Sequence, residues 1–390
     1  MSFEMYIPTR ILFGEGKLNE LGNQKMPGKK AMVITYKKEY TNFNKYLEKV
    51  KEELKRANIE IVIFAEIEEN PTKDSIMEGA KFAKENNCDF VVALGGGSVM
   101  DASKIIAFMA KNDGDVWDYI NGGTGKNQPM KEKPLPVIAI TTTAGTGSEV
   151  DQWGVVNNTI TREKIGFGGY DELFPVISIV DPELTKSVSP EYTAYQGFDA
   201  LFHSVECYIS KSANLMSDMY AEKAIENIGK YLTRAVAYGD DIEAREHLSF
   251  ANNLSGTVMT ISSCTSEHSM EHAMSAYHSN LPHGAGLIMI SKAYFTHFIK
   301  AHVCDERFIK MAKLLGKADS KNPMDFIEML DKLQKECNVA DLKMSDYGII
   351  EDEFEKMAQN AKDTMGGLFM ADRKELTIED CVNIYKESYK

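Results

Sequence analysis

The chain has 390 residues, which is longer than a single hydrophobic core usually grows, so its length predicts two domains. Its 43% hydrophobic and 26% charged residues are typical of a globular protein and exclude a disordered or fibrous one. The formal net charge of −14 argues against nucleic acid or an anionic membrane as the main partner.

The first half of the chain alternates short β-branched runs with amphipathic stretches. The runs predicted to be strands are 31–35, 59–65, 89–94, 135–141 and 176–180. The stretches predicted to be helices are 43–57, 73–85 and 99–111. Because this alternation is typical of a parallel sheet covered by helices, we expect an α/β, Rossmann-like domain over residues 1–187.

A glycine-rich turn follows the strand predicted at 89–94. It consists of Gly95, Gly96, Gly97 and Ser98 and leads into a helix that carries Asp101. Unpaired N–H groups and the partial positive charge at a helix start can hold a phosphate, so this turn is a candidate nucleotide site. The spacing is not G-x-G-x-x-G, and a tight turn that merely needs a positive φ is the alternative.

A second turn, 141–149, follows the next predicted strand and begins with Thr141 and Thr142. Its hydroxyl groups suit a ribose or a phosphate. Since ligands collect at the carboxyl ends of parallel strands, the two turns together predict a nucleotide crevice. A hydroxyl-rich loop without a ligand is the alternative.

Helical periodicity replaces the strands after Ser189-Pro190. A serine cap followed by proline in the first turn is a typical helix start, so we expect a helix to begin there. Beyond it the apolar spacing is helical, for example at Ala221, Ala224 and Ile225. The sequence therefore predicts an all-helical second domain over residues 188–390.

This second domain contains a cluster of candidate metal ligands: Asp199, His203, His268, His272, His278 and His283. Residues four apart share one face of a helix, so Asp199 and His203 can present two ligands together, as can His268 and His272. Carboxylate and imidazole suit a borderline divalent metal. The cluster predicts a mononuclear metal site, with unrelated polar or core histidines as the alternative.

The six cysteines are scattered without a C-x-x-C pair, and neither a signal peptide nor a long apolar segment opens the chain. This pattern predicts a reduced, cytoplasmic protein. Cys207 follows His203 by four residues and Cys264 precedes His268 by four, so either thiol could line the metal cavity. A small core residue is the simpler interpretation of each.

Five ordered motifs carry a resemblance to a known family. They are Gly95-Gly96-Gly97-Ser98-x-x-Asp101, Thr141-Thr142-x-x-Gly145-Thr146-x-Ser148-Glu149, Asp181-Pro182-Glu183-Leu184-Thr185, Gly197-x-Asp199-Ala200-x-x-His203 and Pro282-His283-Gly284. Together they resemble the iron-containing alcohol dehydrogenase family over nearly the whole chain. The His-Ser-Met-x-His run at 268–272 is similar to its butanol-dehydrogenase-like subgroup. The resemblance implies a dehydroquinate-synthase-like fold, with a dinucleotide-binding domain followed by a metal-binding domain.

The resemblance also implies roles for individual residues. The metal ligands would be Asp199, His203, His268 and His283. His272 would lie beside the nicotinamide, and His278 at the mouth of the pocket. The pyrophosphate and the adjoining ribose would be held by Gly95, Gly96, Gly97, Ser98 and Asp101. The rest of the cofactor crevice would be lined by Asn70, Thr141, Thr142 and Lys164.

One position departs from the family pattern. At the end of the first cofactor-facing strand, family members that prefer NAD tend to carry an acidic residue, which repels a 2′-phosphate. This chain has Tyr36 there, followed by Lys37 and Lys38. Because the carboxylate is missing and two cations are near, we expect a preference for NADPH. NADH stays open, since both lysines could be ordinary solvated residues.

The resemblance implies a metal-dependent alcohol dehydrogenase that interconverts small primary alcohols and aldehydes by hydride transfer between the domains. The metal would polarise a carbonyl or acidify an alcohol, His272 could relay the alcohol proton, and the ligands suit Fe(II) and Zn(II) alike. A homodimer is the family-level expectation. The alternatives are a glycerol-dehydrogenase-like polyol oxidoreductase and a metal- or nucleotide-binding sensor without turnover.

Overall fold

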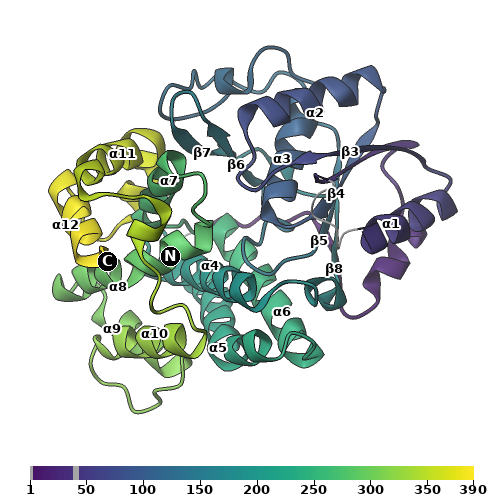
Figure 1. Cartoon of the computed structure of the whole chain (residues 1–390). Coiled ribbons are helices and arrows are strands. Elements are labelled where there is room, and N and C mark those ends of the chain that lie inside the picture. Colours follow the sequence, from purple (N-terminus) through teal and green to yellow (C-terminus); the bar gives the residue numbers. More distant parts are fainter. Residues whose placement is uncertain (1–2, 38–43) are drawn as a thin grey trace.

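A computed structural model describes residues 3–37 and 44–390 of the chain, as an α/β domain beside a helical domain (Figure 1). The strands are β1 (Arg10–Phe13), β2 (Lys30–Tyr36), β3 (Glu60–Ile67), β4 (Phe90–Gly95), β5 (Val137–Thr141), β6 (Trp153–Asn158), β7 (Glu163–Gly168) and β8 (Ile177–Val180). The helices are α1 (Asn44–Arg56), α2 (Lys73–Glu85), α3 (Gly97–Met109), α4 (Pro190–Ile209), α5 (Leu215–Ala237), α6 (Ile242–Ile261), α7 (Ser266–Tyr277), α8 (His283–Lys300), α9 (Asp305–Leu314), α10 (Asp325–Glu336), α11 (Phe354–Ala371) and α12 (Ile378–Ser388).

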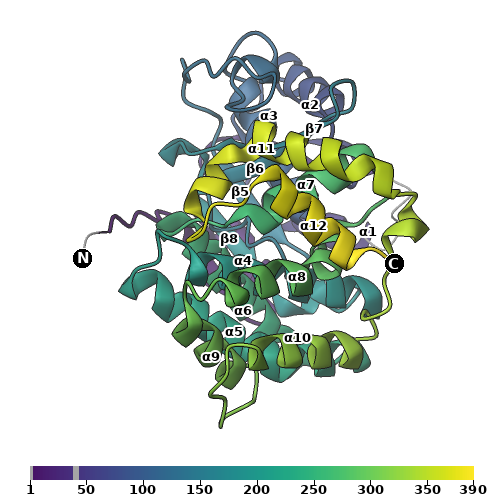
Figure 2. The same cartoon turned by 90° about the vertical axis from the view of Figure 1, so that its left-hand side faces the viewer.

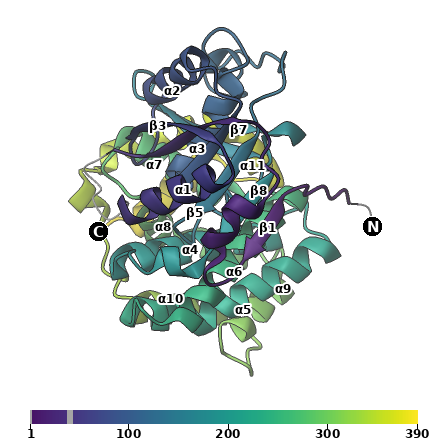
Figure 3. The same ribbon diagram turned by 90° about the vertical axis from the view of Figure 1, so that its right-hand side faces the viewer.

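The main sheet contains six parallel strands in the order β1-β8-β5-β4-β2-β3. Its strands are nearly continuous apolar runs because helices cover both faces. Alternate residues of β2 face opposite sides: Ala31 and Val33 pack in the core beneath α1, whereas Met32 and Ile34 pack with α2 and α3. Figure 3 shows α1 in front of the sheet. The predicted α/β domain is confirmed.

The register of the sheet positions the two candidate nucleotide turns. β4 and β5 are neighbours, and Gly95 at the end of β4 lies opposite Thr141 at the end of β5. Both turns therefore leave the same carboxyl edge of the sheet.

One predicted helix start differs slightly from the structure, and another lies outside the described residues. The helix expected over 99–111 begins earlier, at Gly97. Phe43, the first residue of the helix expected over 43–57, lies outside the described residues, and α1 is described from Asn44.

A two-stranded antiparallel hairpin, β6–β7, was not predicted at all. Its sequence mixes asparagine, glycine and lysine with apolar residues, so it lacks the β-branched run that marks the parallel strands. The hairpin packs against α7 and α11 of the helical domain, and therefore joins the two halves of the molecule.

The helical domain begins as predicted. Ser189 caps α4, its Oγ accepting the N–H of Tyr192 at 3.3 Å, and Pro190 occupies the first turn. Residues of α4 to α8 dominate one large apolar core, and α11 lies across α7 (Figure 2). The boundary predicted at 187/188 falls between β8 and α4 and stays a prediction. None of the described helices is both long and apolar enough to cross a membrane.

Candidate metal centre and nucleotide crevice

The four predicted metal ligands meet where α4, α7 and α8 come together. Asp199 and His203 lie one turn apart on α4, His268 lies in the first turn of α7, and His283 begins α8. Asp199 Oδ1 is 3.4 Å from His203 Nδ1. The same oxygen is 3.5 Å from the Nε2 atoms of His268 and His283. A tetrahedral metal with bonds of ~2.0–2.2 Å separates its ligand atoms by ~3.3–3.6 Å, so these spacings fit one ion.

The facing atoms of this cluster are buried and have no hydrogen-bond partner: they are Asp199 Oδ1, His203 Nδ1 and His268 Nε2. Leaving a buried polar atom unpartnered costs ~1–3 kcal/mol. A cation bound between the three would satisfy them together, and a set of one carboxylate and three imidazoles suits Fe(II) or Zn(II). The donors present therefore fit a divalent metal.

The surroundings favour the protonation states that metal ligands need at Asp199 and His203, but not at His268. Burial opposes ionisation of Asp199, but the neighbouring imidazoles outweigh it and hold the pKa of this carboxyl at about 2. Burial lowers the pKa of His203 to about 4. At His268 burial acts in the same direction, yet Glu206 and Asp199 raise its pKa well above the ordinary value. A cation must therefore displace a proton from His268.

Two further carboxylates orient the ligand imidazoles from behind. Glu206 Oε1 is hydrogen-bonded to Nδ1 of His268, and Glu271 Oε2 to Nδ1 of His283. Such contacts fix the orientation of a ring and strengthen it as a ligand. Sequence reasoning missed both residues. The available signal was that each lies one helical turn after a predicted ligand, His203 or His268.

Of the two histidines predicted to be catalytic, the structure brings His272 to the cluster. Its ring centroid is 5.3 Å from that of His283, and its Nδ1 lies 2.9 Å from Met365 Sδ. Burial and the nearby Lys164 lower the pKa of His272 well below its ordinary value. His278 instead ends α7, where its Nε2 is 2.7 Å from Glu353 Oε2.

The two nucleotide turns pack directly on one another. A Cβ at Gly96 would come within 2.6 Å of Thr143 Cγ2, and one at Gly97 within 2.3 Å of Thr146 Cγ2. Neither glycine has a positive φ, so close approach and not backbone conformation requires them. α3 begins at Gly97, and no side chain caps its first turn. This is the backbone arrangement that receives a phosphate.

Buried polar contacts fix the relative position of these turns. Asp101 Oδ1 accepts from Ser148 Oγ at 2.7 Å, and Asp101 Oδ2 accepts from the backbone N–H of Val155 at 3.0 Å. Lys104 donates to Ser148 Oγ at 2.8 Å and to Asp151 Oδ1 at 2.7 Å. Burial raises the pKa of Asp101 to about 6. Asp101, predicted to bind the cofactor, thus also holds the crevice together.

The threonines of the second turn lie at the edge of the crevice. Thr141 Oγ1 donates to the carbonyl oxygen of Thr143 at 2.9 Å, while the buried Thr142 Oγ1 has no hydrogen-bond partner. The same turn reaches the metal ligands, because a Cβ at Gly145 would lie 3.1 Å from Asp199 Oδ2. The nucleotide crevice and the ligand cluster are therefore contiguous.

Lys164 and Asn70 are also predicted to bind the cofactor, and they lie in different surroundings. Lys164, on β7, is buried, and its Nζ lies 3.5 Å from Glu271 Oε2 and donates to Ser275 Oγ at 2.9 Å. It links the hairpin to the helix that carries His268. Asn70 is half-buried and has a φ of 54°. Their predicted contacts with a cofactor stay predictions.

The residues expected to select the cofactor lie at the end of β2. The hydroxyl oxygen of Tyr36 accepts the backbone N–H of Gly96 at 3.2 Å, which places it at the glycine-rich turn. Lys37 is exposed, with its Nζ 4.0 Å from Glu68 Oε2. Lys38 lies outside the described residues.

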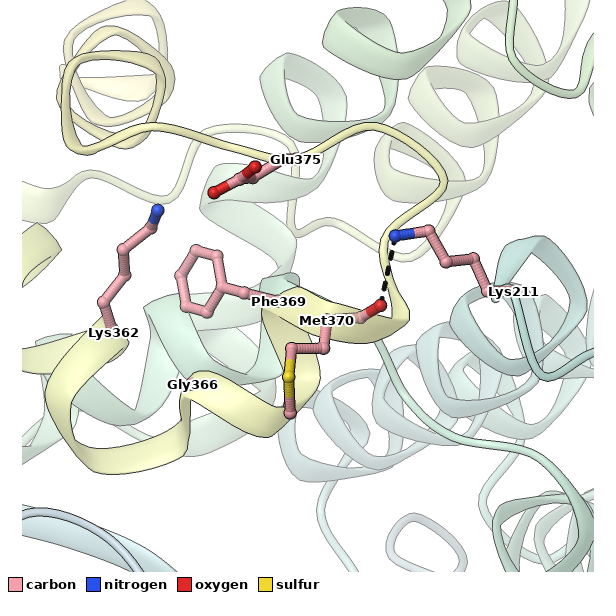
Figure 4. A pocket seen from close by; sticks show the side chains of 6 residues that line it. All are labelled: Lys211, Lys362, Gly366, Phe369, Met370 and Glu375. Carbon is pink, nitrogen blue, oxygen red and sulfur yellow. Dashed lines mark hydrogen bonds between the residues drawn. The ribbon is translucent and has the colours of Figure 1, made fainter.

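A surface cavity of about 380 Å³ lies near the end of α11. It is lined by Lys211, Lys362, Gly366, Phe369, Met370 and Glu375, and Figure 4 shows Lys211 donating to the carbonyl of Met370 at 3.2 Å. None of these lining residues belongs to the ligand cluster. The cavity is nevertheless close in sequence to it, because Gly366 follows Met365, the partner of His272.

Comparisons with known proteins agree with this geometry. The sequence model of the iron-containing alcohol dehydrogenase family matches residues 8–182, and that of the C-terminal part of the Fe-containing alcohol dehydrogenase family matches residues 193–389. NADH-dependent butanol dehydrogenase A of Clostridium acetobutylicum is 30% identical, covering 100% of each chain. The 1,3-propanediol dehydrogenase of Citrobacter freundii is 32% identical over 96% of each. A crystal structure of a mutant archaeal halo-thermophilic alcohol dehydrogenase from a Red Sea brine pool superposes with a TM-score of 0.94 at 36% identity, covering 100% of this chain and 99% of that one.

Proposed function

The chain belongs to the iron-containing alcohol dehydrogenase family, and on this premise we propose that it interconverts small primary alcohols and aldehydes with a nicotinamide cofactor. The observation that carries the proposal is the group of buried, unpartnered ligand atoms on Asp199, His203 and His268, next to the two packed nucleotide turns. Relatives named as butanol and 1,3-propanediol dehydrogenases support a small primary alcohol as the substrate class.

Most residues of the cluster hold the metal, and His272 transfers a proton. A divalent metal, Fe(II) or Zn(II), supplies Lewis acidity toward the substrate oxygen when bound, and the nicotinamide ring exchanges the hydride. Glu206 and Glu271 keep the imidazoles of His268 and His283 aimed at the cation position. His272 has Nδ1 engaged by Met365, so its Nε2 is the nitrogen that exchanges the alcohol proton.

We further propose that NADPH is preferred over NADH. Tyr36 places a neutral hydroxyl at the glycine-rich turn, and the exposed Lys37 beside it can reach a 2′-phosphate. A relative at 30% identity carries the name NADH-dependent butanol dehydrogenase, so the opposite preference is the competing outcome.

A cytoplasmic homodimer is also proposed, and light scattering after size exclusion tests the oligomeric state.

The deciding experiment is a steady-state panel of alcohols and aldehydes with NADH and NADPH. The full chain is stripped of metal and reconstituted anaerobically with Fe(II) or Zn(II) before each assay. Turnover of straight-chain alcohols with one metal and not without it supports the proposal. Higher kcat/KM for glycerol or diols than for butanol would favour the polyol oxidoreductase, and metal binding without any turnover would favour the sensor.

A further inference from the structure

Cys264 lies beside the metal ligands but has no part in the proposed reaction. It occupies the short connection between α6 and α7, and its side chain is half-buried. The ligand atoms of Cys264, His203 and His268 all lie within 4.8 Å of one another. A thiol placed between two imidazoles offers a different donor set from the carboxylate and imidazoles described above.

Two groups of potential ligand atoms overlap at His268. One contains Asp199, His268 and His283, and the other contains His203, Cys264 and His268. In the second group, both His203 Nδ1 and His268 Nε2 are buried and without a hydrogen-bond partner. Because the groups share the His268 imidazole, a single ion can occupy one position or the other, but two ions cannot occupy both with full coordination.

We propose that His203, Cys264 and His268 form a second, thiolate-containing cation position that captures soft divalent metals such as zinc. Thiolate sulfur selects soft cations, whereas carboxylate oxygen suits harder ones. A zinc ion forms bonds of ~2.3 Å to sulfur and ~2.0–2.1 Å to nitrogen, and the ligand atoms of the three side chains already lie within 4.8 Å of one another. On binding, a metal–sulfur bond forms and the thiol proton leaves to solvent, so no oxidant or reductant is required.

This position has a consequence for metal selection. An ion held by Cys264 makes contact with His203 and His268 but is drawn away from His283, which is not part of this group. The proposal rests on the metal site of the proposed function, and it adds that Fe(II) and zinc occupy different positions there. Zinc-loaded protein is then expected to be less active than Fe(II)-loaded protein.

The test uses full-length protein stripped of metal and titrated with Cd(II) or Co(II), whose thiolate complexes absorb in the ultraviolet by charge transfer. Native protein is expected to show this band at one equivalent, and Cys264→Ala to lose it. Competition titrations should show zinc affinity falling by ~10-fold or more in Cys264→Ala, with a smaller change for Fe(II). Cys207→Ala is the matched control, since Cys207 is the buried thiol next to Cys264 and lies outside the group.

The outcomes separate this inference from the proposed function. Absence of the band in native protein, or its loss in Cys207→Ala but not in Cys264→Ala, overturns the thiolate position. Fe(II)-dependent turnover without the band leaves the function intact and removes only the inference. A band that depends on Cys264, in protein that turns over no alcohol with any metal, keeps the cation position and removes the function.

Discussion

The Lys104 network on the sheet side of the crevice and the ligand cluster on the helical side differ in how their buried polar groups are paired. On the sheet side, Lys104 is fully buried, yet it donates to Ser148, Asp151 and the carbonyl of Trp153 at 2.7–2.8 Å. On the helical side, Asp199 Oδ1 faces His203 Nδ1 and His268 Nε2 at 3.4–3.5 Å, and none of these atoms has a hydrogen-bond partner.

The difference indicates that the Lys104 network is stable without a ligand, whereas the ligand cluster needs a bound ion. A buried network in which every member is paired is rigid, whereas partly satisfied buried groups are costly unless something binds them. The nucleotide turns should therefore keep their shape without ligand. Metal binding should both rigidify the histidine cluster and make it catalytically active.

Removing the metal or its ligands should have the largest effect on activity and a small one on the sheet. Asp199→Ala and His268→Ala should each lose metal retention and reduce kcat/KM by ~10³-fold or more, since Lewis acidity contributes several kcal/mol. Elemental analysis, aldehyde reduction and far-UV circular dichroism check this together. Chelation of the native protein should reproduce the result. Full activity in verified metal-free protein would contradict the metal assignment.

Lys104→Met tests the other side of the comparison. It leaves Asp151 and Asp101 buried without their cation, which should lower the free energy of unfolding by ~3–5 kcal/mol. Urea unfolding measures the change, and Lys81→Met on the exposed face of α2 is the control. If Lys104→Met unfolds like the native protein, the turns are not held by this network.

The sequence predicted the parts of the fold whose patterns are strong. β2, β4 and β5 are buried on both faces and so read as unbroken apolar runs. Ser189-Pro190 fixed the start of α4 because a cap acts locally. The ligand cluster was visible because its i, i+4 pairs are also local.

What the sequence could not supply was contact between distant segments. Glu206 and Glu271 orient ligands only because α4, α7 and α8 meet, and the one local signal of either residue is its position one helical turn after a predicted ligand. The same holds for Lys164, whose amino group reaches from β7 to α7. A need for a positive φ was the alternative explanation of the glycines in the first turn, but Gly96 and Gly97 are required because the second turn packs against them.

His272→Ala should have a smaller effect than loss of a ligand. The proposed proton relay contributes ~10²-fold to the rate, so kcat should fall by about that factor while metal content and KM stay near native. His278→Ala is the matched comparison, because His278 is bonded to Glu353 at the other end of α7. A larger fall in kcat for His278→Ala than for His272→Ala would reverse the assignment of the proton relay.

The smallest expected effect concerns the cofactor at the end of β2. Tyr36→Asp puts an anion where a 2′-phosphate is proposed to lie, and losing or opposing one charge-assisted contact is worth ~1.5–3 kcal/mol, or roughly tenfold or more in kcat/KM. Selectivity should therefore shift toward NADH. Tyr36→Phe is the control, since it removes the hydroxyl contact to Gly96 and adds no charge. Lys37→Ala should weaken NADPH more than NADH. If the native enzyme already prefers NADH in kcat/KM, the interpretation of this strand end is wrong, while the metal and hydride-transfer assignments stand, because neither of them depends on Tyr36 or Lys37.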